Sequence, residues 1–170
     1  MMQWLLALVM AMVGGIVAIA ATGTDEAEAA TQRTLHIPAS AFTPRIGGIG
    51  YNNLGLYVQQ AGGTVGQYFH APVWLEGETA TVHSVTLHYL DRGPSGVCAY
   101  LRRPKPNFTG YKTMAAMCTR GDFNSIRAKT DSIIQPDFVG VTTTPYVEVT
   151  LPPGGAYRVY GVTIVYTSNG

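Results

Sequence analysis

Short runs of alternating apolar and polar residues, separated by glycine, proline and asparagine, constrain the fold of this chain more than any other feature. The clearest run spans residues 80–91 (ATVHSVTLHYLD), and another, residues 146–151 (YVEVTL), places Val147, Val149 and Leu151 on one side. A period of two residues is typical of a β-strand with one buried face. Beyond position 30 no long stretch shows helical periodicity. The pattern therefore predicts an antiparallel β-protein.

Further segments show the same alternation. Residues 113–119 (TMAAMCT) fit either a strand or one helical turn, and in the last run we expect Tyr160, Val162, Ile164 and Tyr166 to share one face. About seven to nine strands without crossover helices predict an all-β domain, a two-sheet antiparallel β-sandwich or jelly roll, over residues 30–170. The remaining alternating segments are residues 35–37, 54–58, 65–75, 97–101 and 157–167.

The charge content excludes one class of partner. Only 12% of the residues are charged, against roughly 25% in an average soluble domain. Residues 30–170 contain eleven basic and seven acidic residues, a net charge of +4. Because the basic residues are scattered along the chain and form no stripe, we expect no nucleic-acid partner.

An uncharged apolar run of eighteen residues, 4–21, begins the chain and is followed by an acidic segment. Ala27, Glu28 and Ala29 form the small-x-small pattern of a signal-peptidase site, which makes residues 1–29 a signal peptide. The run is also long enough for a retained membrane anchor helix, in which case residues 4–21 would contact the membrane. Both interpretations place residues 30–170 outside the cytoplasm.

The chain has two cysteines, Cys98 and Cys118. An even number of cysteines in an exported chain predicts a disulfide. A bond that closes a loop of this length contributes about 3 kcal/mol in the chain-entropy model. A metal site would need more ligands at short spacing, and no histidine lies near either cysteine in the sequence.

Four segments, in this order, resemble a group of exported bacterial β-sandwich proteins of jelly-roll type, most of them uncharacterised. The resemblance implies the fold and the extracytoplasmic compartment. It implies no catalytic motif, so no site residue is transferred. The segments are Leu35–Pro44 (LHIPASAFTP), Ala71–Leu75 (APVWL) before a glycine turn, Val85–Asp91 (VTLHYLD) and Arg158–Thr167 (RVYGVTIVYT).

No arrangement of residues in the sequence indicates a catalytic site, and we expect neither an enzyme nor a cofactor. Glu148 alternates outward on its strand and is expected to face solvent, and Asp91 ends a strand at a turn. No Gly-x-Ser-x-Gly nucleophile motif is present. A carboxylate pair of the kind that glycosidases use therefore has no clear candidates.

The four histidines predict no metal site. His83 and His88 have an odd spacing, which places them on opposite faces of one strand and prevents joint chelation. A metal site built from His36, His70 and either His83 or His88 is geometrically possible, but no short-spaced pair of histidines indicates it.

Aromatic residues are the remaining candidates for a binding site. By alternation Trp74 points away from Val73 and Leu75, and together with Tyr68 and His70 it would form a platform on which a sugar ring stacks. The alternative is that Trp74 covers the second sheet. The segment RRPKPN also forms a small basic cluster, Arg102, Arg103 and Lys105, which would touch an anionic glycan or a partner, or simply lie in a solvated loop.

Three functions remain open. The leading interpretation is an exported, non-catalytic module at the cell surface, structural or adhesive, which associates with itself or with a cell-envelope partner. The second is a carbohydrate-binding module that uses an exposed aromatic platform at Trp74. The third is a hydrolase whose site assembles only in three dimensions.

Overall fold

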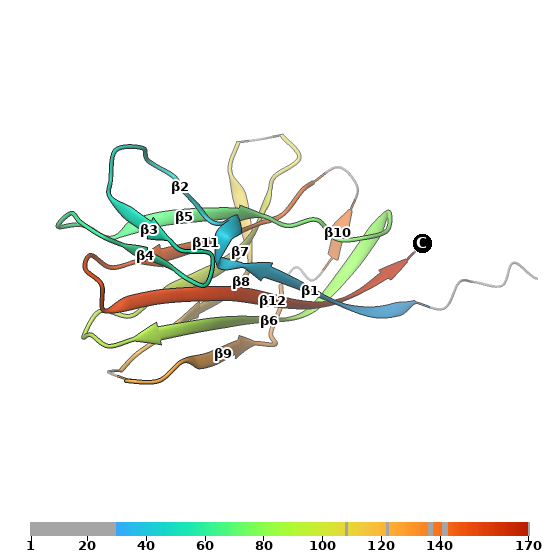
Figure 1. Ribbon diagram of the computed structural model, residues 1–170. Coiled ribbons are helices and arrows are strands. Elements are labelled where there is room, and N and C mark those ends of the chain that lie inside the picture. The colour runs from blue at the N-terminus through green and yellow to red at the C-terminus, as the bar shows by residue number, and fades with distance from the viewer. Residues whose placement is uncertain (1–29, 108, 122, 136–137, 141–142, 170) are drawn as a thin grey trace, which may run out of the picture.

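The computed structural model contains two antiparallel β-sheets packed as a sandwich (Figure 1). The predicted signal peptide or anchor, residues 1–29, lies outside the described residues. Within the described part of the chain, no helix has the length and apolarity needed to cross a membrane. The described residues are 30–107, 109–121, 123–135, 138–140 and 143–169.

Sheet A has seven strands and is built on two long ones, β6 (Thr79–Asp91) and β12 (Tyr157–Asn169), which pair along nearly their whole length. Two short strands, β9 and β10, pair with β6, and two others, β1 and β4, pair with β12. A last strand, β3, extends the sheet beyond β4. The shorter strands are β1 (Thr31–Pro38), β3 (Tyr51–Asn53), β4 (Val58–Gln60), β9 (Arg127–Asp131) and β10 (Phe138–Gly140).

Sheet B has five strands in the order β2–β5–β11–β7–β8. Its central strand, β11, pairs with β5 on one side and with β7 on the other. A single-turn 3-10 helix, η1 (Ala39–Ala41), connects β1 of sheet A to β2 of sheet B. The strands are β2 (Thr43–Pro44), β5 (Gln67–Pro72), β7 (Cys98–Pro104), β8 (Tyr111–Cys118) and β11 (Tyr146–Leu151).

The core lies between the two sheets, as the alternating pattern predicts. Val147, Val149 and Leu151 of β11 are fully buried, and Val85 and Leu87 of β6 face them from the other sheet. Large apolar side chains are thus removed from water on the inner face of both layers, the dominant stabilising contribution to such a fold. The all-β, two-sheet prediction is confirmed for the described residues between 31 and 169.

The prediction that Tyr160 shares the buried face of its strand is wrong, because a β-bulge lies at Gly161. The pairing of β12 with β6 shifts between Val159 and Gly161, so Tyr160 faces outward while Val162 and Ile164 remain in the core. Gly161 has a φ of +154°, and a Cβ atom there would lie 2.6 Å from the carbonyl oxygen of Ile37. Only glycine therefore fits at this position, where Pro38 of β1 pairs with the bulge.

A second bulge corrects the expected orientation of two histidines. The register pairs Val165 with Ser84 and Tyr166 with Val82, which leaves His83 without a partner residue in the ladder. His83 then hydrogen-bonds Thr167, and His88 lies 3.0 Å from Thr163 Oγ1. Both histidines therefore lie on the outer face of sheet A, and the prediction of opposite faces is wrong.

The two cysteines lie at disulfide distance, as expected. Cys98 of β7 and Cys118 of β8 are directly paired in the antiparallel ladder and are joined by a disulfide, with their Cα atoms 4.0 Å apart. Residues 113–118 belong to a strand rather than a helical turn. The bond therefore joins β8 to the rest of sheet B covalently.

Candidate functional site

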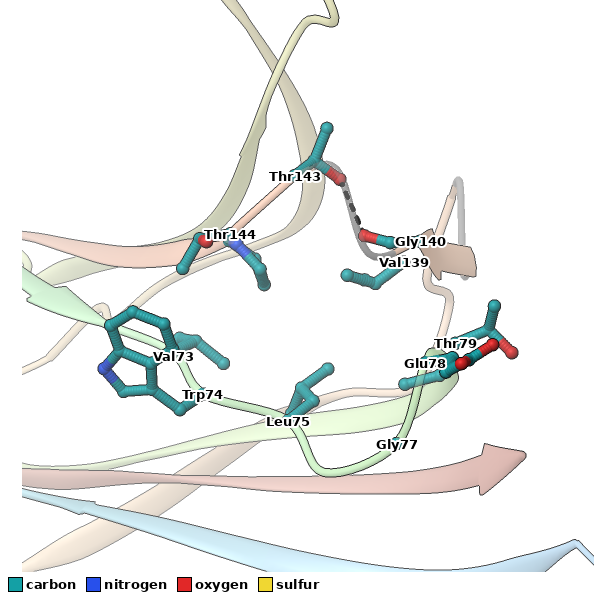
Figure 2. Close-up of a pocket in the computed structure, with 12 residues that line it drawn as sticks. Val73, Trp74, Leu75, Gly77, Glu78, Thr79, Val139, Gly140, Thr143 and Thr144 are labelled. Carbon is teal, nitrogen blue, oxygen red and sulfur yellow. Dashed lines mark hydrogen bonds between the residues drawn. The ribbon is translucent and has the colours of Figure 1, made fainter. Parts of the chain in front are cut away.

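A cleft opens at one end of the sandwich, between the segment that leaves β5 and the segment that enters β11 (Figure 2). Its volume is about 190 Å³. We call it the Trp74 cleft. It is lined by two segments of the chain: Val73, Trp74, Leu75, Gly77, Glu78, Thr79 and Ala80 from the first, and Val139, Gly140, Thr143, Thr144 and Pro145 from the second.

Backbone hydrogen bonds hold the two walls of the Trp74 cleft in place. The amide of Val73 donates to the carbonyl of Pro145 at 3.0 Å, which ties one wall to the other beside Trp74. The amide of Thr143 donates to the carbonyl of Gly140 at 3.2 Å and closes the opposite turn. The cleft is therefore supported by the sheet on both sides of its opening.

Trp74 stands at the rim of this cleft with 71% of its surface exposed, while its neighbour Val73 is buried. The indole therefore does not cover the second sheet. In Figure 2 the indole and Thr144 lie at one end of the opening, and Glu78 and Thr79 lie at the other end. An indole face, threonine hydroxyls and a carboxylate around a small cleft can stack on a sugar ring and hydrogen-bond its hydroxyls.

The structure separates Tyr68 and His70 from the Trp74 cleft. Both lie on the outer face of β5, two residues apart, and neither lines the cleft. Tyr68 is 38% exposed, and the guanidinium carbon of Arg45 lies 5.7 Å from the centre of its ring. His70 is half-buried and has its Nε2 atom 2.8 Å from Oε2 of Glu148. Of the three predicted platform residues, Trp74 alone is at the cleft.

Glu148 is not the solvated carboxylate that the sequence pattern indicates. It points away from the core, as predicted, yet only 1% of its surface is exposed, because side chains of the neighbouring strands lie over it. Its other oxygen, Oε1, lies 2.9 Å from Nη1 of Arg102 on β7. Arg102 Nε has no hydrogen-bond partner among the described residues, so the contact is an ion pair rather than a bidentate bond.

Tyrosine rings surround this ion pair on the outer face of sheet B. The guanidinium carbon of Arg102 lies 4.7 Å from the ring centre of Tyr100 and 4.0 Å from that of Tyr111. Tyr146 packs against His70 with ring centres 5.2 Å apart. Burial raises the pKa of the Tyr146 phenol above its ordinary value, although Arg102 opposes the shift. Sequence reasoning missed the cluster because its members come from four strands that only the sheet register brings together.

The structure does not bring His36 and His70 together, so the metal site left open by the sequence does not form. His36 and His88, on the outer face of sheet A, have ring centres 6.1 Å apart and both contact Thr163 Oγ1, at 3.1 and 3.0 Å. His70 lies on the other sheet. Burial, and secondarily the nearby His36, lower the pKa of His88. Among the described residues, no group of three or more His, Cys, Asp or Glu side chains is placed to hold a metal ion.

Comparison with solved structures shows a shared fold. The C-terminal CBM6, a carbohydrate-binding module, of LamC, a marine laminarinase from Zobellia galactanivorans, superposes with a TM-score of 0.51 at 11% sequence identity. The match covers 78% of this chain and 98% of that one. The xylan-binding module CBM86 from Roseburia intestinalis gives a TM-score of 0.48 at 10% identity, over 79% of this chain and 94% of that one. No family model and no curated protein matches the sequence.

Proposed function

We propose that this chain is a non-catalytic carbohydrate-binding module that holds a glycan at the Trp74 cleft. The observation that carries the proposal is Trp74 itself, a tryptophan 71% exposed at the rim of a cleft with polar groups on its walls. Burying an indole face against a sugar removes apolar surface from water on both partners. The shared fold with a carbohydrate-binding module supports this function over the adhesive one that leads from the sequence alone.

The cleft is better suited to binding than to hydrolysis. Glu78 is the one carboxylate among the residues that line it. Glycoside hydrolysis ordinarily uses two carboxyl groups about 5–10 Å apart, one of them an acid and the other a base or nucleophile. The neighbouring carboxylate Glu148 is buried in an ion pair on the outer face of sheet B and does not line the cleft. These features favour binding of a glycan without its hydrolysis.

An extracytoplasmic location belongs to the same proposal. The Cys98–Cys118 disulfide is typical of oxidising compartments, where polysaccharides of cell walls and matrices are also found. The signal peptide or anchor expected at residues 1–29 would deliver the sandwich there.

The test is binding of the purified chain to a panel of polysaccharides that includes laminarin and xylan, by affinity electrophoresis. We expect retardation by at least one of them, and a loss of about tenfold or more in affinity for Trp74→Ala, because central tryptophans dominate such interfaces. Leu56→Ala is the matched control, since Leu56 is 76% exposed and lies outside the cleft. Equal binding by both variants, or binding to nothing in the panel, would contradict the proposal.

A further inference from the structure

A second hollow lies at the β7–β8 hairpin, which is yellow in Figure 1 and projects beyond the edge of the sheets. Its volume is about 430 Å³. We call it the hairpin cleft. Three of its six lining residues are cationic and none is acidic. The lining residues are Arg103, Pro104, Lys105, Pro106, Asn107 and Lys112.

The register of the hairpin places these cations on one face. Arg103 of β7 is directly opposite Lys112 of β8, so their side chains project to the same side. Lys105 follows Arg103 by two residues, which is the spacing of side chains that share a face, and its amide continues the ladder by donating to the carbonyl of Gly110 at 2.9 Å. Three positive groups therefore converge on one hollow.

The two lysines of the hairpin cleft are exposed cations. No carboxylate is among the residues that line the cleft. Among the described residues, no salt bridge involves Lys105 or Lys112. An anion in the cleft would supply a counter-charge for these two lysines.

Local hydrogen bonds and two prolines shape the hairpin backbone near these groups. Asn107 Oδ1 accepts from the amide of Thr109 at 3.2 Å and from its hydroxyl at 2.7 Å, which closes the tip as an Asx turn. Pro104 and Pro106 restrict the backbone on either side of Lys105. A backbone that is already restricted loses less conformational entropy when a ligand binds.

The hairpin cleft lies at the same end of sheet B as the Trp74 cleft. Tyr146 of β11 pairs with Pro72 of β5 and with Arg102 of β7. Trp74 follows Pro72, Thr144 precedes Tyr146, and Arg103 follows Arg102. Three adjacent strands therefore lead from one cleft to the other, with about 5 Å between neighbouring strands.

We infer that the hairpin cleft binds the acidic groups of an anionic polysaccharide, carboxylate or sulfate, whose neutral rings stack on Trp74. This inference rests on the proposed function and names the class of glycan that the module takes. Lys105 and Lys112 act as point charges that meet the carboxylate or sulfate, and Arg103 adds a third positive charge to the lining.

The test compares matched charged and neutral polymers. The purified chain is titrated with polygalacturonate and with its methyl ester, and separately with dextran sulfate and dextran. We expect the charged member of at least one pair to bind about tenfold or more tightly at low salt, and this preference to fade as salt rises, because exposed charges are screened. The pair that shows the preference identifies carboxylate or sulfate as the recognised group.

Variants then separate the two proposals. Lys105→Gln/Lys112→Gln should abolish the preference for the charged polymer, while Arg92→Gln/Arg120→Gln, which removes the same charge from two other exposed positions, should preserve it. Binding that is equal for charged and neutral polymers and is lost in Trp74→Ala would overturn the inference and leave the proposed function standing. Charge-selective binding that is lost in the lysine variant but unaffected by Trp74→Ala would support an anion site in the hairpin cleft and contradict the stacking on Trp74 that the proposed function requires. Absence of binding to every polymer would overturn both.

Discussion

Glu148 is the residue at which local pattern and observed environment differ most. The alternation of β11 assigns its direction correctly, away from the core, but direction and exposure are separate properties. Its cross-strand neighbours are His70 and Tyr100, and with Arg102 they form an outer cover that a single strand's sequence does not contain. A carboxylate buried in this way is stable only while its partners remain.

We therefore expect Glu148→Ala to lower the free energy of unfolding by about 3 kcal/mol, because the largely buried Arg102 side chain would lose its counter-charge. Urea unfolding followed by circular dichroism measures the change. Glu76→Ala is the control, since the Glu76–Arg33 pair is exposed and should contribute less than about 1 kcal/mol. Equal effects of the two substitutions would show that the Glu148 pair is not a stabilising element.

The lowered pKa of His88 predicts that the free energy of unfolding depends on pH. Burial and the adjacent His36 lower its pKa in the folded state below the ordinary value of 6.5. The unfolded chain then binds a proton at His88 more readily than the folded chain does, so the free energy of unfolding falls as pH decreases below about 6.5. His88→Asn should reduce the stability difference between pH 7.5 and pH 5 in urea unfolding. An unchanged difference would contradict the burial assigned to His88.

At the scale of elements, alternation predicts strands well where one face is buried and poorly elsewhere. β6, β11 and β12 were all indicated by their apolar period, but β9 was not. The residues of β9, Arg127–Asp131, are mostly exposed and carry no apolar period, because this edge strand pairs with β6 without covering the core. Bulges are equally difficult to predict from the sequence, because one extra residue in a strand leaves the local composition unchanged while it reverses which side chains face the core beyond it.

The β7–β8 hairpin carries the disulfide and gives a prediction at this scale. Replacing both cysteines, Cys98→Ala and Cys118→Ala, should lower the free energy of unfolding by about 3 kcal/mol, because the unfolded chain regains the freedom of a loop with a sequence separation of 20. Denaturation of the two proteins under oxidising conditions measures the difference. If the wild-type chain is equally stable with and without a reductant, the bond contributes nothing.

At the scale of the whole molecule, the sequence predicted the architecture but only one wall of the site. The exposure of Trp74 follows from its position in an alternating run, so the sequence could predict this part of the cleft. The opposite wall is formed by Val139, Gly140, Thr143, Thr144 and Pro145, more than sixty positions later in the chain, and it meets Trp74 only through the pairing of β5 with β11. No local signal specifies that pairing. The hairpin cleft was visible only as a basic cluster, because its geometry depends on the register of β7 and β8.

The central claim is that Trp74 is the contact surface for a glycan, and its own fluorescence tests it most directly. The chain has two tryptophans, Trp4 and Trp74, so Trp4→Phe leaves Trp74 as the sole reporter. Titration of this variant with the polysaccharide that binds should shift the emission of Trp74 to shorter wavelength and saturate at the same concentration as binding, because a sugar ring displaces water from the indole. Saturable binding with no change in Trp74 emission would contradict the account.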